Sequence, residues 1–248
     1  MKRFLLIFLA PASLLCAQKA APPVMPVVPD AVPPQIQTLQ PGVKLTLLAE
    51  HPDLVTPTGI DVDKNGNIYL IACHTHFRPE GYVGPEHDEV LIFDKDGKNR
   101  RVFYNKTVAT MKLILGPDGW VYLAERGRIM RVKDTNGDSI ADLEENIATL
   151  DTVADYPHNG LSGMAWHPDG GLVISLGENF GKDWTLTGKD GAKVNGRGEG
   201  GVFRSTAEGN ELRRIARGFW NPFGLMGSSD GAIFAAEDDP GSGPPCRL

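Results

Sequence analysis

Cysteine and excess positive charge are both scarce in this sequence of 248 residues. Three cysteines are too few for a fold built on disulfide bonds. Lysine and arginine number 25 against 31 aspartates and glutamates, and the net charge of −6 offers no basic surface for nucleic acid. We therefore expect no nucleic-acid partner. Hydrophobic residues make up 41% and charged residues 23%, which is the composition of a globular protein.

Long apolar runs are missing after the N-terminus. Two basic residues precede an apolar stretch over 4–15, which is too short to span a bilayer, and cleavage after Ala17 fits a signal peptide. We expect residues 1–17 to be a signal peptide and the mature protein to be periplasmic or secreted, with no transmembrane span after it. An uncleaved anchor is the alternative. Residues 18–41 contain seven prolines and few charges, and we interpret them as an extended linker.

Glycine (29 residues) and proline (19 residues) are abundant, which favours many short strands joined by turns. One turn pattern, an Asp-Gly or Asn-Gly pair and then an apolar strand, occurs four times. Its glycines, Gly66, Gly119, Gly170 and Gly231, are 53, 51 and 61 residues apart. Four strands in about fifty residues are typical of a propeller blade. The sequence predicts an all-β propeller over residues 42–248, with a β-sandwich as the alternative.

The fourth copy of the pattern stops about two strands after its turn begins. We expect about four blades that belong to a six-bladed parent, truncated at its C-terminus. The alternative is a small four-bladed ring in which residues 43–50 close the last blade, because an open propeller leaves sheet edges bare.

Three loops carry polar residues that a turn does not need. In the first, His74 and His76 would point the same way on an extended backbone, and with His87 they are candidate ligands of a divalent metal. The alternative is a loop that fixes its own shape by hydrogen bonds.

The second loop has oxygen donors at EF-hand positions 1, 3, 5, 9 and 12, although Ser139 stands where that loop has glycine. The donors are Asp134, Asn136, Asp138, Asp142 and Glu145. They predict a structural calcium site, with an aspartate-rich hairpin turn as the alternative.

The third loop contains His158 and opens the third copy of the pattern. A histidine at the start of a blade faces the channel, where it can act as a general base near neutral pH. A structural histidine is the alternative.

His158, the turn 168–170 and the segment 175–178 resemble the soluble glucose/sorbosone dehydrogenases. These are periplasmic six-bladed propellers that use pyrroloquinoline quinone (PQQ) and calcium. The resemblance implies that His158 is the base that takes a sugar hydroxyl proton. A Gly-x-Arg-Asn-Pro-x-Gly turn of that family corresponds to 218–224, with Trp220 in place of the arginine. An indole supplies one N–H where a guanidinium supplies charge and several donors, and Arg217 is the nearby candidate to replace it.

The strings 74–82, 177–179 and 243–248 resemble more closely the "membrane-bound dehydrogenase domain" propellers of PVC-type bacteria. Full members of that group continue to a haem-binding Cys-x-x-Cys-His motif, which this sequence lacks. The resemblance implies an electron-acceptor protein such as a c-type cytochrome.

We therefore expect an extracytoplasmic propeller that oxidises a sugar or polyol with PQQ, or a fragment of one that is inactive. His158 would be catalytic. Five residues would bind the cofactor: Asn159, Glu178, Asn179, Trp220 and Asn221. The first alternative is a non-catalytic propeller that binds carbohydrate or a protein partner. The second is a calcium-dependent, lactonase-like hydrolase that uses the carboxylates of Glu178, Glu237 and Asp238.

Overall fold

The computed structural model describes residues 39–43, 45–155 and 159–237. The chain divides into two compact units, Met1–Thr46 and Leu47–Leu248. The predicted signal peptide, residues 18–38 of the predicted linker, His158 and Asp238 lie outside the described residues. Among the described helical residues, none belongs to a helix long and apolar enough to cross a membrane.

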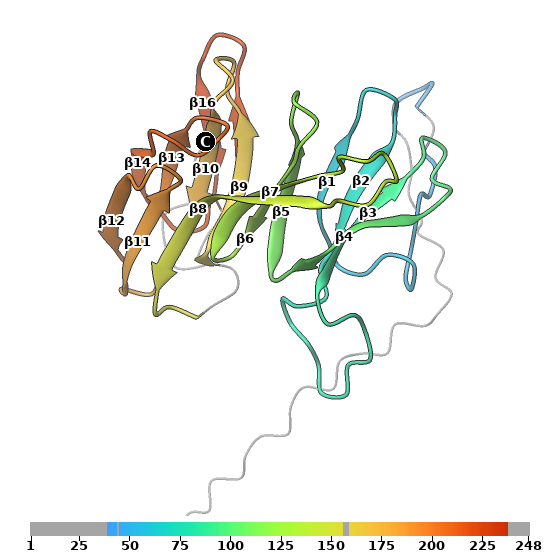
Figure 1. Cartoon of the computed structure of the whole chain (residues 1–248), viewed down its shortest axis with the longest axis horizontal. Coiled ribbons are helices and arrows are strands. Elements are labelled where there is room, and N and C mark those ends of the chain that lie inside the picture. Colours follow the sequence, from blue (N-terminus) through green and yellow to red (C-terminus); the bar gives the residue numbers. More distant parts are fainter. Residues whose placement is uncertain (1–38, 44, 156–158, 238–248) are drawn as a thin grey trace, which may run out of the picture. The chain divides into compact units, whose positions relative to one another are not determined.

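The second unit begins with a four-stranded antiparallel sheet whose strands lie in chain order (Figure 1). Its strands are β1 (Pro57–Val62), β2 (Ile68–Ala72), β3 (Asp88–Phe93) and β4 (Arg101–Thr107). Ile60, Leu70 and Leu91 lie opposite one another across three of these strands. The Asn-Gly turn between β1 and β2 holds Gly66 at a φ of 86°, a conformation that glycine adopts readily.

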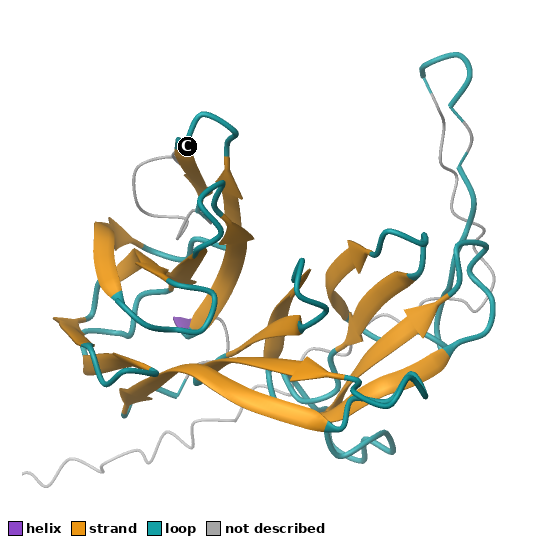
Figure 2. Ribbon diagram, turned by 45° about the horizontal axis from the view of Figure 1, so that its top comes forward, coloured by secondary structure: helices purple, strands orange, loops and turns teal. Residues whose placement is uncertain are grey.

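A second sheet contains a hairpin that comes from later in the chain. Its core is formed by β5 (Thr110–Leu115), β6 (Val121–Glu125), β7 (Arg128–Lys133) and β8 (Leu143–Thr152). The hairpin of β11 (Asp183–Gly188) and β12 (Lys193–Arg197) pairs with β8, which extends the sheet to six strands. Figure 2 shows β8 as a long strand that continues from β7 to this hairpin.

The third sheet has the strand order β14-β13-β10-β9, and a two-stranded sheet follows it. The strands are β9 (Leu161–Trp166), β10 (Leu172–Leu176), β13 (Gly200–Ser205), β14 (Arg213–Phe219), β15 (Gly224–Gly227) and β16 (Ile233–Ala236). The first strands of successive sheets are neighbours, with β1 against β5, β5 against β9, and β9 against β15. This arrangement confirms the predicted all-β propeller. Residues 43 and 45–50, which the four-bladed alternative required as a closing strand, form no strand.

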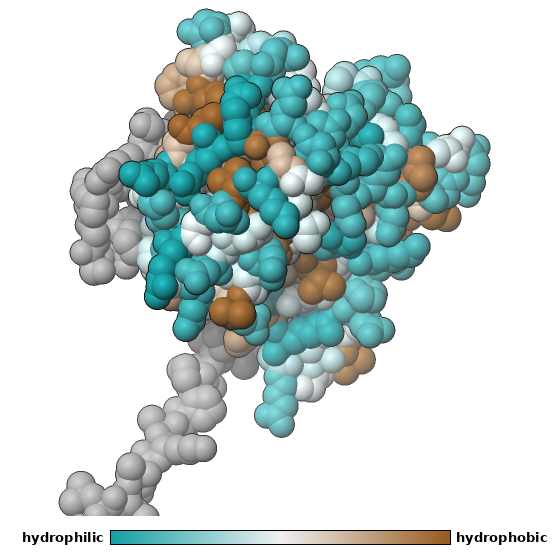
Figure 3. Space-filling view, turned by 60° about the vertical axis from the view of Figure 1, so that its left-hand side comes forward, coloured by the Kyte–Doolittle hydropathy of each residue, from teal (hydrophilic) through white to brown (hydrophobic). Residues whose placement is uncertain are grey.

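Buried apolar side chains fill the spaces between neighbouring sheets. Ile71 and Val90 of the first sheet join Leu113 and Leu123 of the second in one cluster. In another cluster, side chains of the second sheet meet those of the third, such as Phe203. Burying each such side chain stabilises the fold by roughly 1.5–3 kcal/mol. The side of the molecule shown in Figure 3 is mostly hydrophilic, and the hydrophobic residues visible on it form separate patches.

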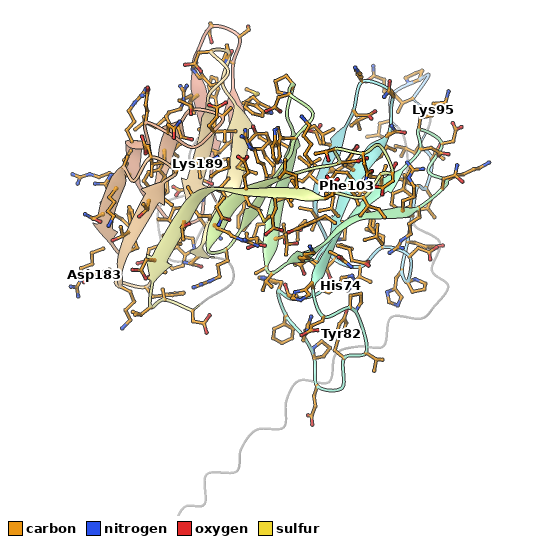
Figure 4. All side chains as sticks on the ribbon, in the orientation of Figure 1. His74, Tyr82, Lys95, Phe103, Asp183 and Lys189 are labelled. Atoms are coloured by element: carbon orange, nitrogen blue, oxygen red, sulfur yellow. The ribbon has the colours of Figure 1, made fainter. Side chains whose placement is uncertain are left out.

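The antiparallel strands place two kinds of connection at opposite ends of each sheet. The four repeated turns lie at one end, here called the turn end, as does the Asp134 loop between β7 and β8. The longer connections, including 73–87 and 177–182, lie at the other end, here called the loop end. Figure 4 shows the difference in the first sheet, where Lys95 and His74 lie at opposite ends. The predicted calcium loop is therefore at the turn end, and the predicted cofactor residues are at the loop end.

Candidate functional site

Backbone hydrogen bonds join four segments at the loop end of the third sheet. The amide of Gly177 donates to Gly160 O (3.0 Å), and that of Glu178 donates to Trp220 O (2.6 Å). The amide of Asn179 donates to Gly198 O (2.8 Å). These bonds bring together all five residues predicted to bind a cofactor, although they come from segments up to sixty residues apart.

The strand order explains this meeting. Asn159 precedes β9, Asn179 follows β10, and Asn221 follows β14, so all three lie where strands of one sheet end. A Cβ on Gly177 would lie 2.9 Å from Asn159 Cα and 2.9 Å from Asn221 Oδ1. Glycine is needed at position 177 because a larger residue would push these segments apart.

The asparagine cluster, defined as Asn159, Asn179 and Asn221, is buried, with exposed fractions of 1%, 0% and 3%. Asn179 Nδ2 donates to Asn159 O (3.1 Å) and to Gly177 O (2.8 Å). Within the described ranges, Asn159 Nδ2, Asn179 Oδ1 and Asn221 Oδ1 have no hydrogen-bond partner. An unpaired buried polar group costs about 1–3 kcal/mol. The cluster therefore has one donor and two acceptors available, which a ligand hydroxyl or a buried water would satisfy.

Two carboxylates border the cluster. Glu178 accepts hydrogen bonds from the amides of Phe180 (2.6 Å) and Gly181 (2.8 Å). Glu237 accepts one from the amide of Trp220 (2.8 Å). Arg217, the candidate replacement for the family's arginine, has an exposed side chain 4.0 Å from Glu199. Glu178 and Glu237 thus place two carboxylates in hydrogen-bonded loops beside the asparagines.

One cation approaches the cluster from the second sheet. The side-chain stem of Arg126 packs on Gly160, where a Cβ would lie 2.3 Å from Arg126 Cγ. Its guanidinium donates to Ala154 O, and burial lowers the pKa of Arg126. This arginine holds the segment that leads to Asn159.

Sequence reasoning missed the aromatic partner of Trp220. The rings of Phe180 and Trp220 meet edge to face, with centroids 6.0 Å apart and an interplanar angle of 84°. Phe180 is 49% exposed and has a φ of 50°. Phe180 directly follows the Gly-Glu-Asn string at 177–179, and this position in the sequence could have marked it as a residue of the site. The pair gives the site an apolar surface beside its amides.

PQQ fits this part of the site poorly. The cofactor carries three carboxylates, and anions of this kind are held by arginine or lysine. The described residues offer neutral amides and two carboxylates, and the Arg126 guanidinium already donates to Ala154 O. Trp220 replaces the arginine expected there. We therefore derive no step through PQQ. His158, the predicted base, lies outside the described residues and stays a prediction.

The Asp134 loop uses its carboxylates for its own turn. Asp134 accepts hydrogen bonds from the amides of Asn136 (3.1 Å), Gly137 (2.7 Å) and Ser139 (2.8 Å), and these bonds lower the pKa of Asp134. Asp142 accepts from the amide and hydroxyl of Thr135. The loop matches the alternative of an aspartate-rich turn.

The last residue of the proposed calcium set, Glu145, pairs with two cations instead. It lies 2.9 Å from Arg131 and 2.7 Å from Lys189. Over the described part of the chain, no group of three or more His, Cys, Asp or Glu residues is gathered closely enough to hold a metal ion. The calcium site therefore stays a prediction, and the observed arrangement does not fit it. Its predicted ligands are Asp134, Asn136, Asp138, Asp142 and Glu145.

The histidine loop also fixes its own shape. His74 Nδ1 lies 2.5 Å from Tyr82 Oη, and Nε2 lies 3.5 Å from Glu89. Figure 4 shows His74 and Tyr82 together in this loop. Because both ring nitrogens of His74 face protein groups, the geometry favours a hydrogen-bonded loop over the predicted metal site with His76 and His87.

Three comparisons place the chain among known proteins. A family described as "Domain of unknown function (DUF7133)" matches residues 34–242. The chain has no match among the curated proteins. Two solved glucose dehydrogenases are similar in fold, with 18% and 17% identity and TM-scores of 0.51 and 0.50.

The alignments cover 79% and 76% of this chain, which spans 65% and 59% of the two dehydrogenases. The PQQ domain of a pyranose dehydrogenase from Coprinopsis cinerea matches at 14% identity and a TM-score of 0.45, over 74% of this chain and 44% of that one. The two glucose dehydrogenases therefore support the β-propeller fold.

Proposed function

The chain belongs to the family described as a domain of unknown function (DUF7133), and from the geometry of its loop end we propose that it binds a neutral sugar or polyol at the asparagine cluster. The observation that carries this proposal is the set of three unpartnered carboxamide atoms, one donor and two acceptors, in one buried place. A hydroxyl both donates and accepts, so a polyhydroxylated ligand satisfies such a set.

Two further features support a sugar. Trp220 and Phe180 present aromatic surface next to the amides, and a sugar ring has an apolar face that packs on such rings. The glucose dehydrogenases that share the fold act on a ligand of this class by their names. In this proposal the protein works outside the cytoplasm, as the N-terminal sequence predicts.

The residues of the site have distinct tasks in binding. Asn159 Nδ2 donates to a ligand oxygen, and the Oδ1 atoms of Asn179 and Asn221 accept from ligand hydroxyls. Glu178 and Glu237 hold the backbone of the loops by accepting amide hydrogen bonds. His158, which directly precedes Asn159 in the chain, stays the predicted base for the proton of a bound hydroxyl.

The finer predictions stand apart from this proposal. Oxidation with PQQ, transfer of electrons to a c-type cytochrome and membership of the "membrane-bound dehydrogenase domain" group all require residues beyond the described site. A calcium-dependent lactonase would need Glu178 and Glu237 as ligands, yet both carboxylates accept backbone amides.

The test is a ligand screen of the full chain by saturation-transfer NMR with aldoses, polyols and aldonic acids. We expect neutral aldoses or polyols to bind and aldonates to bind more weakly, because the carboxylates of Glu178 and Glu237 are nearby. Dye reduction by the same samples with added PQQ would show whether oxidation accompanies binding. Absence of any sugar or polyol signal from a chain with a β-type circular dichroism spectrum would contradict the proposal.

A further inference from the structure

A cavity lies at the turn end of the sheets, at the opposite end of the strands from the asparagine cluster. Its volume is about 670 Å³, within the range of small-molecule sites. This open pocket is lined by the repeated turns of the first three sheets and the residues beside them, including Val62, Tyr69, Trp120, Trp166 and His167. None of these residues takes part in the site described above.

Three aromatic side chains, one from each sheet, form its walls. Trp166 Nε1 donates to Leu115 O (2.8 Å), which fixes the indole. Tyr69 packs edge to face on Phe103, with ring centroids 5.6 Å apart. The Arg131 guanidinium lies over Trp120, 4.4 Å from the ring centroid. The aromatic walls are therefore held in place without a ligand.

Two acceptor side chains around this cavity, Asp63 and His167, are already engaged. Asp63 accepts hydrogen bonds from the amides of Asn65 (2.8 Å) and Asn67 (2.8 Å). His167 lies 2.8 Å from Asp169 through Nδ1 and 3.1 Å from Gly231 O through Nε2. A ligand that needs acceptors, such as a polyol, would find few here.

Two aromatic side chains of the lining, Trp120 and Tyr69, carry hydrogen-bond donors. Neither the Trp120 indole N–H nor the Tyr69 hydroxyl makes a hydrogen bond within the part of the chain that the structure describes. Burial raises the pKa of Tyr69, so its hydroxyl keeps its proton at neutral pH. Aromatic walls with free donors complement a flat ring that carries an acceptor oxygen.

We infer that this turn-end cavity binds a small neutral aromatic molecule that bears a carbonyl or ether oxygen. The ring packs between Trp120, Trp166 and Tyr69, and the oxygen accepts a hydrogen bond from the indole or the phenol. This is a second ligand site, independent of the sugar site.

Coumarin, a neutral aromatic lactone, is the probe, and its binding to the full chain is measured by ligand-observed NMR. Val62, 52% exposed, lines the cavity, so Val62→Trp fills the space without disturbing the core. Ile60→Trp is the matched control, because Ile60 lies on the same strand at 58% exposure and outside the cavity. We expect coumarin to bind the wild type and the control and to lose at least tenfold in affinity for Val62→Trp.

Two further samples separate this site from the sugar site. Tyr69→Phe should weaken coumarin binding by about two- to tenfold, the value of one hydrogen bond, and Asn221→Ala should leave it unchanged. Failure of coumarin to bind the folded chain at millimolar concentration would overturn the inference. Equal affinity of Val62→Trp and Ile60→Trp for coumarin would also overturn it. So would benzoate or glucose binding the wild type more tightly than coumarin does, if Val62→Trp abolished that binding.

Discussion

At the scale of single residues, Asp88 makes the most connections in the first half of the propeller. Its buried carboxylate accepts hydrogen bonds from the amides of His74 (2.7 Å) and Thr75 (2.8 Å) in its own sheet. It also accepts from the amide and the hydroxyl of Thr110, both at 2.8 Å, where β5 of the next sheet begins. One side chain therefore ties two blades together.

Replacing Asp88 with alanine should lower the free energy of unfolding by roughly 3 kcal/mol or more, since several buried donors lose a charged acceptor. Asp88→Asn should lower the free energy of unfolding by less, because one carbonyl oxygen remains to accept hydrogen bonds. Urea denaturation followed by circular dichroism measures both. Asp96→Ala, at an exposed turn position, is the control. An Asp88→Ala loss no larger than that of the control would refute this role.

A second prediction concerns pH and Asp169. Hydrogen bonds from Arg204, from the Gly171 amide and from His167 lower the pKa of Asp169 below its ordinary value of 3.8. Because the folded-state pKa is lowered, these interactions contribute stability above 3.8, and the contribution is lost as the pH falls toward the folded-state value. Asp169→Asn should therefore destabilise the chain near neutral pH and make its acid unfolding less steep. The measurement is the free energy of unfolding as a function of pH, and equal slopes for the variant and the wild type would contradict this prediction.

At the scale of secondary-structure elements, the inserted β11–β12 hairpin is held by one aromatic side chain. Trp184 is 2% exposed and meets Phe203 of the third sheet edge to face, with centroids 5.8 Å apart. A Cβ on Gly196 of β12 would lie 2.1 Å from this indole. Lys189, at the hairpin turn, pairs with Glu145 of β8 (2.7 Å), and Figure 4 labels Asp183 and Lys189 at opposite ends of β11.

Trp184→Ala should cost about 3–5 kcal/mol, the usual loss for a large buried aromatic. It should also release the hairpin, so that a protease that cuts after lysine or arginine cleaves between Lys189 and Arg197 before the chain unfolds. Mass spectrometry of short digests measures this. Cleavage in the hairpin at the same rate as in the wild type would contradict the packing role.

The same elements show how much of the fold could be predicted. The repeated turns located the neighbouring strands well: the apolar strand expected after the turn at Gly66 is β2. No strand was predicted for β8 or for β11 and β12. β8 begins with exposed, charged residues after the Asp134 loop. The β11–β12 hairpin lies within the third copy of the repeat but pairs with the second sheet, which the repeat does not predict.

At the scale of the whole molecule, the repeat places its turns at one end of the blades and its polar loops at the other. That arrangement let the sequence predict Asn159, Glu178, Asn179, Trp220 and Asn221 as one site, and the structure brings them together. The sequence could not show which amide atoms lack partners or that Glu237 contacts the Trp220 amide, because these depend on contacts between separate segments. The replacement of the family's arginine by Trp220 was a first sign of the poor fit to PQQ in the sequence, and the structure added the carboxylates of Glu178 and Glu237.

The measurement that tests the central claim most directly is isothermal titration of the best-binding sugar or polyol into the full chain and its Asn221→Ala variant. Asn195→Ala is the matched control, because Asn195 lies on β12, outside the cluster. The account predicts binding to the wild type and the control with one affinity, and a loss of about two- to tenfold or more for Asn221→Ala. Equal affinity for all three proteins would contradict the claim that the asparagine cluster is the sugar site.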